Sequence, residues 1–323
     1  MGALYLKHRL KNFSALFLFC ILLPYTLAML TGKAGRVEEK VETDGIYVTD
    51  TTSHGTERIS EEAYLLGAMA ASISPKFEME ALKAQAVLLR TNLYEAYIRE
   101  GNKTERTVED EAIGQQYLDY WQMRDLWGEK EEQWKERYMQ AVRETAGEIM
   151  TYEGIPVQAP YFYVSAGRTR DASEVFRAEE HPYLTGVECP QDMLCPEFSV
   201  QYTYSARILD KKLQQFWEEQ GAASEEGIFA MELTRDNSGY ILQVTDRKSG
   251  KSCSGEAMRT FLGLPSSCFE WKEENNKIII TVKGKGHGIG MSQFGANELA
   301  KQGEDSSAIL NHFFHGIEIQ KSE

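Results

Sequence analysis

The spacing of apolar residues changes partway along this 323-residue chain, and that change constrains the fold more than any other feature. Up to about residue 150, apolar side chains recur every three or four positions, as they do on one face of a helix. From about residue 155 they alternate with polar side chains, as they do in half-buried strands. Helices and strands in separate parts of a chain are typical of a mixed α/β protein of the α+β type, which is the fold class we predict.

Capping and turn residues place the individual elements. Ser60 is an expected N-cap, because Glu61 and Glu62 follow it in a first turn where the helix dipole favours acidic side chains. Helices are predicted over about residues 61–72, 78–99 and 129–150, with a polar loop over 101–115 and a shorter helical pattern over 296–301. Strands are predicted over residues 45–49, 155–164, 202–208, 229–234, 240–245 and 277–282, with a turn at Asn275-Asn276.

An uncharged apolar run covers residues 13–30, which is just long enough to span a membrane. Lys7, Arg9 and Lys11 precede it and several acidic residues follow, so the positive-inside tendency keeps the N-terminus in the cytoplasm. We therefore predict a single-pass anchor in the cell membrane with an extracytoplasmic folded domain. A cleaved signal peptide is the alternative, since the run is short and Thr31-Gly-Lys-Ala34 is rich in small residues.

Composition divides the remaining chain into a linker and a folded domain. The predicted parts are residues 1–31 as cytoplasmic tip and anchor, 32–44 as linker, and 45–320 as folded domain, with a core from 45–199 and 283–320 and a β-rich lobe from about 200–282. The chain carries 35 Lys and Arg against 49 Asp and Glu, a net charge of −14, without a basic patch that contains interleaved aromatic residues. This composition argues against a nucleic-acid partner.

Glycine occupies every second position from Gly284 to Gly290 and recurs at Gly295. Such a segment allows the backbone to approach a ligand closely, and His287, Ser292 and Gln293 add polar side chains to it. The spacing does not fit a phosphate-binding loop, because the Gly-Lys-Ser/Thr ending is missing. From the residues alone, a tight glycine loop with a hydrogen-bonded histidine is the favoured explanation, because isolated glycine motifs often occur without a ligand.

The cysteines outside the apolar run fall into two pairs. Cys253 and Cys268 lie in a predicted β segment, and we expect a disulfide between them. Cys189 and Cys195, with His181 eight residues before the first, supply three possible zinc ligands. A small disulfide loop or free thiols explain this second pair as well, since the spacing is not that of a standard zinc knuckle and a fourth ligand is not evident.

Two segments together resemble the paired signatures of a known family. Glu80-Ala-Leu-Lys-Ala-Gln-Ala-Val-Leu-Leu-Arg-Thr91 and Gly286-His-Gly-Ile-Gly-Met-Ser-Gln-Phe-Gly-Ala296 resemble those of the stage II sporulation protein D (SpoIID) family, which includes relatives named LytB. Further landmarks of that family follow in the same order at residues 115–117, 141–147, 165–169, 182–184 and 312–316. The chain departs from the family pattern at Ser72 and Ala166, where many members carry Glu and Gly.

The resemblance implies a lytic transglycosylase that needs no cofactor for catalysis. Such an enzyme cleaves the bond between N-acetylmuramic acid and N-acetylglucosamine in glycan strands stripped of peptides, and leaves 1,6-anhydro ends. In spore formers it works during engulfment from the mother-cell membrane, facing the septum, with a SpoIIP-like hydrolase and a SpoIIM-like membrane protein. The family's catalytic acid maps onto Glu80. The resemblance also favours a structural zinc ion bound by His181, Cys189 and Cys195.

The chemistry of this reaction needs only one carboxyl group. Other glycosidases use two carboxylates, but here the C6 hydroxyl of the muramic residue attacks within its own sugar. One carboxyl can therefore protonate the leaving oxygen and then accept the proton of that hydroxyl. Glu80 must carry a proton near neutral pH to do this, whereas its place near a helix N-terminus and three residues before Lys83 favours the ionised form.

The remaining expected site residues are candidates for glycan contact. Gln85 and Arg90 are off the Glu80 face of their helix, so they line a broader groove or anchor the helix. Arg168 could pair with the lactyl carboxylate of muramic acid, and His287 could orient Glu80 or hold a sugar hydroxyl. The full expected set of substrate-binding residues is Gln85, Arg90, Ser165, Arg168, His287, Ser292 and Gln293.

Two other functions are alternatives to the transglycosylase. A serine nucleophile built from Ser165 and His287 is disfavoured, because no acidic third member is evident. A non-catalytic glycan-binding activator of a cell-wall amidase, the role suggested for LytB-like relatives, needs the same groove. Only the transglycosylase requires a protonatable Glu80.

Overall fold

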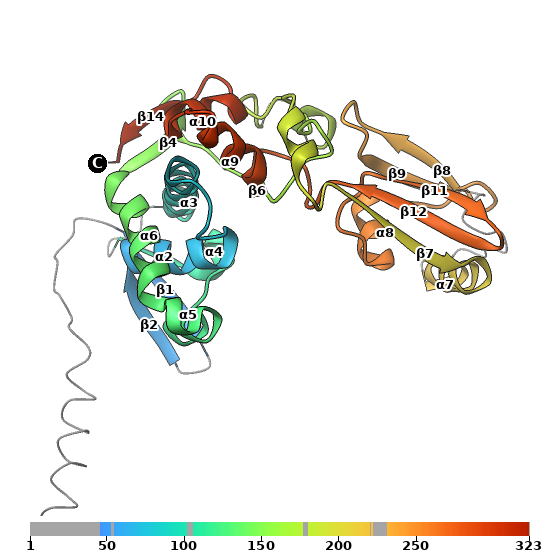
Figure 1. The fold of residues 1–323 in the computed structure, drawn as a ribbon, viewed down its shortest axis with the longest axis horizontal. Coiled ribbons are helices and arrows are strands. Elements are labelled where there is room, and N and C mark those ends of the chain that lie inside the picture. Colours follow the sequence, from blue (N-terminus) through green and yellow to red (C-terminus); the bar gives the residue numbers. More distant parts are fainter. Residues whose placement is uncertain are drawn as a thin grey trace, which may run out of the picture. The chain divides into compact units, whose positions relative to one another are not determined.

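The computed structural model describes residues 46–52, 55–101, 106–176, 180–219, 221 and 231–322 (Figure 1). These residues belong to one unit that begins at Gly45. The apolar run at 13–30, and with it the predicted anchor, tip and linker, lies outside the described residues. Within the described ranges, no helix is both long enough and apolar enough to cross a membrane. The mixed α/β fold class is confirmed.

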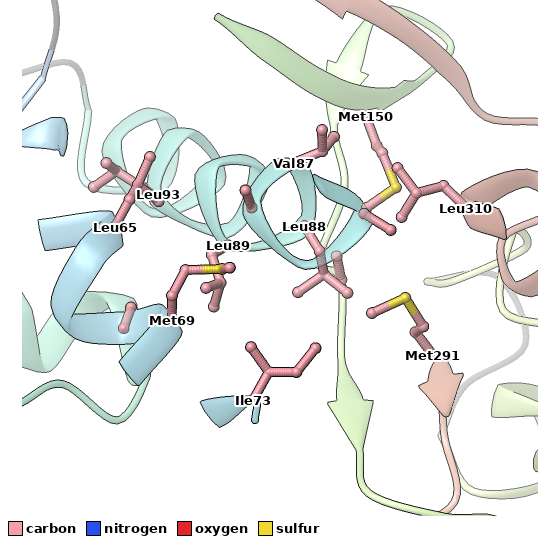
Figure 2. Close-up of a cluster of buried hydrophobic side chains, with 14 of the residues drawn as sticks. Leu65, Met69, Ile73, Val87, Leu88, Leu89, Leu93, Met150, Met291 and Leu310 are labelled. Carbon is pink, nitrogen blue, oxygen red and sulfur yellow. The ribbon is translucent and has the colours of Figure 1, made fainter. Parts of the chain in front are cut away.

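The helical core is built around α3 (Met79–Arg99), a 21-residue helix that buries side chains on most of its surface. The helices with the most extensive contacts to it are α2 (Glu61–Ser72), α6 (Glu131–Glu144), α9 (Gln293–Lys301) and α10 (Ser306–Phe313). Figure 2 shows Leu88, Leu89 and Leu93 of α3 among side chains from α2, α10 and the neighbouring strands. Every residue from Ala84 to Thr91 is buried, so the middle of α3 lies in the interior of the domain.

Short sheets surround these helices. The first has the order β2 (Gly55–Ser60), β1 (Tyr47–Thr52), β3 (Thr107–Glu109), and another has the order β14 (Glu318–Lys321), β4 (Glu148–Tyr152), β5 (Ile155–Pro156). A parallel pair joins β6 (Tyr161–Phe162) to β13 (Met291–Ser292), with Met291 opposite Tyr161. This pair holds the C-terminal glycine-rich segment against residues 161–162 and leads directly into α9.

Residues 199–283 form a β-rich part with its own buried cluster. Two antiparallel sheets have the orders β11 (Phe269–Glu274), β12 (Lys277–Lys283), β7 (Ser199–Ser205) and β10 (Ser252–Ser254), β9 (Ile241–Asp246), β8 (Met231–Arg235). The helices of this part are α7 (Ala206–Glu219) and α8 (Gly255–Leu262). Leu209, Leu213 and Trp217 of α7 are spaced four residues apart and are fully buried against strand residues of the cluster.

Several predicted elements are confirmed. Ser60 caps α2 by accepting a hydrogen bond from the amide of Ala63, and the helix has the predicted bounds. Asn275 and Asn276 have φ angles of 53° and 58° and turn the hairpin between β11 and β12. Both conformations are left-handed, as a two-residue hairpin turn requires, and asparagine tolerates them better than most residues.

Other predicted elements are wrong. The helix expected over 129–150 ends at Glu144, because Gly147 has a φ angle of 71° and residues 148–152 pair as β4. The loop expected over 101–115 contains β3 and the short helix α4 (Asp110–Ile113). The strand expected over 202–208 ends at Ser205, and α7 begins at Ala206. The strand expected over 155–164 is reduced to β5 and β6, and α5 (Tyr120–Trp127), α8 and α10 were not predicted.

The disulfide expected between Cys253 and Cys268 is also wrong, because both are free thiols. Cys253 lies on β10, whereas Cys268 directly precedes β11, and these strands belong to different sheets. Cys189 and Cys195 are buried free thiols at either end of the 3-10 helix Pro190–Leu194. Of the alternatives left open for this second pair, the disulfide loop is therefore not formed, and both thiols are free.

Candidate active site

Glu80 lies in the first turn of α3, and one third of its side chain is exposed. Its carboxylate has two hydrogen-bond donors. The ammonium of Lys83 lies 2.8 Å from Oε1, and the backbone amide of Ser306 donates to Oε2 at 2.9 Å. Ser306 is the first residue of α10, and the first amides of a helix have no partner within the helix. The carboxylate of Glu80 therefore satisfies one of these amides from a residue 226 positions away.

Lys83 connects Glu80 to a second carboxylate. Its Nζ lies 2.6 Å from Oε2 of Glu144, the last residue of α6. The amide of Gln140 holds the other oxygen of Glu144 at 2.8 Å. Hydrogen bonds to Glu144 and to Glu80 raise the pKa of the Lys83 ammonium, and the Lys83 contact lowers the pKa of Glu144. Lys83 is thus a cation shared by two carboxylates on two helices.

The N-terminus of α3 is held in place by α9. The side-chain oxygen of Asn297 accepts a hydrogen bond of 2.8 Å from the amide of Glu78, the N-cap residue of α3, which makes no side-chain cap itself. Asn297 is buried. This contact fixes the first turn of α3, and with it Glu80, relative to the C-terminal segment.

Gln85 and Gln293 meet inside the protein. The amide nitrogen of Gln293 donates to Oε1 of Gln85 at 3.2 Å and to the carbonyl of Ser72 at 2.9 Å. Both glutamines are at most 3% exposed. They tie α3 to α9 and to the end of α2, and neither presents a polar group to solvent. Ser72 itself donates from Oγ to the carbonyl of Ala68 at 2.7 Å, so it bonds back to its own helix.

Arg90 is fully buried and anchors α3 to α6. Its guanidinium donates to Oε1 of Glu61 at 2.7 Å, to the carbonyl of Val142 at 3.1 Å and to the carbonyl of Thr145 at 2.7 Å. The last carbonyls of a helix have no hydrogen-bond donor within the helix. At the end of α6, the guanidinium of Arg90 provides such donors. Of the two predicted roles for Arg90, this geometry fits the anchor.

The alternating glycines allow segments of this chain to pack closely against each other. Gly284, Gly286, Gly288 and Gly290 all have φ angles between 75° and 118°, which side-chain-bearing residues rarely adopt. A Cβ on Gly290 would lie 2.1 Å from the carbonyl oxygen of Pro160, and one on Gly286 would lie 2.6 Å from Cβ of Phe162. The close approach that these glycines permit is thus to the segment around β6.

His287 has both ring nitrogens occupied. Nδ1 accepts a hydrogen bond from the amide of Ile289 at 3.1 Å, and Nε2 lies 3.0 Å from the carbonyl of Tyr161. A carbonyl can only accept, so the proton of the neutral ring belongs on Nε2. Burial lowers the pKa of His287 and favours this neutral form. The ring of His287 therefore contacts its own loop and β6, and among the described residues its hydrogen-bond partners are Ile289 and Tyr161 rather than Glu80.

Ser165 and Ser292 are brought together by Asp192, a residue that the sequence did not reveal as part of a site. The backbone amide of Ser165 donates to Oδ2 of Asp192 at 2.8 Å, and the hydroxyl of Ser292 donates to Oδ1 at 3.0 Å. All three residues are fully buried, and burial raises the pKa of Asp192. The hydroxyl of Ser292 also caps α9 by accepting from the amide of Gly295. The position of Asp192 between Cys189 and Cys195 was the signal available in the sequence.

The side chains expected to contact muramic acid or zinc have other partners. Arg168 pairs with Glu188 and donates to the carbonyl of Gly186 at 3.0 Å. His181 lies 3.2 Å from the hydroxyl of Tyr183, and the thiol of Cys189 lies 3.7 Å from the carbonyl of Val187.

Across the part of the chain that the structure describes, no group of three or more His, Cys, Asp or Glu side chains could hold a metal ion. His181, Cys189 and Cys195 therefore do not fit a zinc site in this arrangement.

Comparison with known proteins identifies the family. A family model described as "Stage II sporulation protein" matches residues 49–152, a range that contains Glu80, Lys83 and Glu144. Stage II sporulation protein D of Bacillus amyloliquefaciens is 33% identical over 276 residues, which cover 84% of this chain and 78% of the Bacillus protein. The chain belongs to the stage II sporulation protein D family.

Further relatives of this SpoIID-family chain extend the comparison. Stage II sporulation protein D of Bacillus subtilis is 32% identical over 282 residues, which cover 86% of this chain and 79% of that protein. A protein named amidase enhancer, also from Bacillus subtilis, is 26% identical over 304 residues, which cover 79% of this chain and 40% of the enhancer. The predicted family resemblance is confirmed.

Proposed function

We propose that this SpoIID-family protein is a peptidoglycan lytic transglycosylase that acts on denuded glycan strands, with Glu80 as its acid and base. The accessibility of Glu80 carries the proposal. One third of its side chain is exposed, whereas Gln85, Arg90, Ser165, Ser292 and Gln293 are at most 3% exposed. The side chain of Arg168 is also exposed, but Glu80 is the one carboxyl group among the predicted site residues, and a polymeric substrate can reach it.

The reaction then proceeds by two proton transfers at one carboxyl group. Protonated Glu80 gives its proton to the glycosidic oxygen as the bond between that oxygen and C1 of the muramic residue breaks. The C6 hydroxyl of the same sugar attacks C1, and the resulting carboxylate of Glu80 accepts its proton. The new bond between C1 and O6 closes the 1,6-anhydro ring, so no water is consumed.

The neighbours of Glu80 suit the second half of this cycle. The Ser306 amide and the Lys83 ammonium both donate hydrogen bonds, and a carboxylate accepts them. In the first half, Glu80 must hold a proton, and this requires the Lys83 contact to loosen when glycan binds. The buried residues Gln85, Arg90 and Gln293 support the reaction by holding α3 in place.

The setting that we propose for the reaction is supported by the family and by the N-terminal sequence. We place the domain outside the cell membrane on the anchor predicted at residues 13–30, with a role in sporulation. The relative named amidase enhancer favours a cell-wall hydrolase as partner. A SpoIIP-like hydrolase and a SpoIIM-like membrane protein are the specific candidates, and no metal is part of the mechanism.

An alternative function is that of a non-catalytic glycan-binding activator of a cell-wall amidase. Two observations favour it. A relative is named for that activity, and the two contacts of Glu80 are both hydrogen-bond donors. In this case Glu80 would have a structural role at the start of α10.

A comparison of glycan products separates the two functions. Denuded strands are incubated with the full-length protein in detergent, and the products are analysed by mass spectrometry. The variants are Glu80→Gln and, as a control, Glu62→Gln, an exposed glutamate at the same second position of α2. Anhydro ends formed by wild type and Glu62→Gln but not by Glu80→Gln support the transglycosylase. Anhydro ends from Glu80→Gln contradict the role of Glu80, and intact strands that bind to all three proteins support the activator.

A further inference from the structure

We propose that a basic hollow at the start of α7 binds the carboxylates of a denuded glycan strand. The basic side chains that line this hollow are those of Arg207, Lys211 and Lys212. The inference rests on the proposed function, because it takes denuded glycan as the polymer on which the protein acts. The residues of the hollow hold the strand and take no part in breaking its bonds.

The hollow consists of two adjoining depressions, with volumes of about 620 Å³ and about 610 Å³. Ser205, Arg207 and Lys211 belong to the walls of both, so the two form one continuous surface. Sites for small ligands have volumes of about 300–1,000 Å³, and this surface therefore has room for part of a polymer chain. It lies at the end of β7, where α7 packs on β7 and β12 (Figure 1).

The helical repeat of α7 brings the basic side chains to this surface. Arg207 and Lys211 are four residues apart, so they lie one turn apart on the same face of the helix. Lys212 and Ile208, also four residues apart, form the neighbouring stripe. All of these side chains are exposed, whereas the opposite face of α7 is the one that is buried in the β-rich part.

The positive charge of this surface is not neutralised within the protein. Among the described residues, none of the three basic side chains forms an ion pair, whereas Arg168, Lys285 and Lys301 each pair with a glutamate. Asp210 is the acidic residue in the described lining, so three positive charges face one negative charge. In a chain with a net charge of −14, such a local excess of positive charge is a place where an anion can bind.

The other lining groups favour a carbohydrate as the anion. The hollow is also lined by hydroxyl and amide side chains, which can donate and accept hydrogen bonds as sugar hydroxyl and acetamido groups require; these are Ser205, Gln214, Gln215 and Asn276. Ile208 is 59% exposed and offers an apolar surface to the CH groups of a sugar ring. A denuded strand carries a lactyl carboxylate on each muramic residue, so it supplies both the sugar and the charge. A flat lipid surface would not enter a hollow.

Binding of denuded strands tests the inference without any need for activity. The full-length protein in detergent carries Glu80→Gln in every sample, so that strands stay intact, and the fluorescence anisotropy of end-labelled strands reports binding. The hollow variant, in which Arg207, Lys211 and Lys212 are all changed to Gln, should bind about tenfold more weakly. Asp210→Asn removes the negative charge from the hollow and should strengthen binding.

A control variant separates the hollow from the overall charge of the protein. It changes Lys130, Lys135 and Lys272, which are exposed lysines away from α7, to Gln and loses the same number of positive charges. This variant should bind like the starting protein. Both triple variants should unfold at the starting protein's urea concentration, because exposed side chains contribute little to stability. Equal binding by the hollow and control variants overturns the inference.

Modified strands test which group is recognised. Strands whose lactyl carboxylates are converted to methyl amides keep their sugars and lose their charge, so the starting protein and the hollow variant should bind them equally weakly. Added salt should weaken binding to the starting protein more than binding to the hollow variant, because salt screens charges. Displacement of the strand by polyphosphate or by the lipid headgroup glycerophosphoglycerol, at a lower concentration of charge than free denuded strand needs, assigns the hollow to a phosphate-bearing partner and overturns the inference.

Kinetics with Glu80 intact separate the hollow from the reaction. The hollow variant should raise KM for denuded strands with little change in kcat, because its residues do not contact the bond that breaks. If wild type forms no anhydro ends but the hollow variant loses binding as expected, the proposed function fails and the binding surface stands. If anhydro ends form but the hollow variant binds strands as tightly as the control variant, the binding surface fails and the proposed function stands.

Discussion

The hydroxyl of Ser292 donates a hydrogen bond of 3.0 Å to the carboxylate of Asp192, which lies 100 positions earlier in the chain and is fully buried. The amide of Ser165 binds the other oxygen of the same carboxylate. A buried carboxylate with two donors thus joins the N-cap of α9 to the segment that follows β6. This junction holds the glycine-rich segment in place.

Asp192 makes the stability of the protein depend on pH in a defined direction. Burial raises the pKa of Asp192 in the folded state above its usual value of 3.8. Its contribution to the free energy of unfolding is therefore fully present below that value and is lost as the pH rises through the higher folded value. Relative to Asp192→Asn, the wild type should lose stability as pH rises from about 3.5, with a slope of at most about 1.4 kcal/mol per pH unit. Urea unfolding of both proteins at several pH values measures this, and parallel curves would contradict it.

His287 should produce a pH dependence on the acidic side of neutrality. Burial lowers its pKa in the folded state below the usual value of 6.5, so the unfolded chain binds a proton first as the pH falls. The wild type should therefore lose stability below about pH 6.5, by at most about 1.4 kcal/mol per pH unit, and His287→Gln should lack this loss. Thermal or urea unfolding between pH 5 and 8 checks the difference. A decline of equal size in both proteins would show that another group is responsible.

Gly290 should tolerate a side chain far less well than Gly303, although both have left-handed backbones with φ angles of 81° and 98°. A Cβ on Gly290 would lie 2.1 Å from the carbonyl oxygen of Pro160, whereas one on Gly303 would meet nothing within 4 Å. Gly303→Ala should cost about 1 kcal/mol of backbone strain. Gly290→Ala should cost at least about 2 kcal/mol more, because the segment must move away from Pro160. Equal costs in urea unfolding would contradict the close packing of this segment.

Arg90 should matter for stability and not for glycan contact. Its side chain is 1% exposed, and Arg90→Met leaves Glu61 and the carbonyls at the end of α6 without their donor. We expect a loss of about 3–5 kcal/mol in the free energy of unfolding. Arg143→Gln breaks an exposed ion pair and should cost less than about 1 kcal/mol. Weaker glycan binding by folded Arg90→Met, at unchanged stability, would instead assign Arg90 to the substrate.

Several elements could be predicted from the sequence because their causes are local. Residues close by in the sequence determine four of them: the cap at Ser60, the bounds of α2, the extent of α3 and the turn at Asn275-Asn276. The helix α7 was missed because the alternation that ends at Ser205 was extended to Ile208. Its own pattern, with Leu209, Leu213 and Trp217 four residues apart, was present in the sequence.

The candidate site shows where local reasoning ends. The two family signatures and the pairing of Glu80 with Lys83 could be read directly, since residues three apart on a helix are neighbours. The sequence contained no sign that Ser306, 226 positions later, would donate to Glu80, or that Glu144 would share Lys83. Burial of Gln85, Arg90 and Gln293 was equally hidden, because it depends on α6, α9 and α10 packing around α3.

Local sequence was therefore sufficient for the position of the carboxyl group on its helix, for the family and for the fold class. Packing alone set which partners that carboxyl group has and which polar residues are removed from solvent. The physical reason is the distance along the sequence over which each kind of interaction acts. Capping, helix spacing and backbone preference act over a few residues, whereas hydrogen-bond partners and burial arise from segments that meet only when the chain is folded.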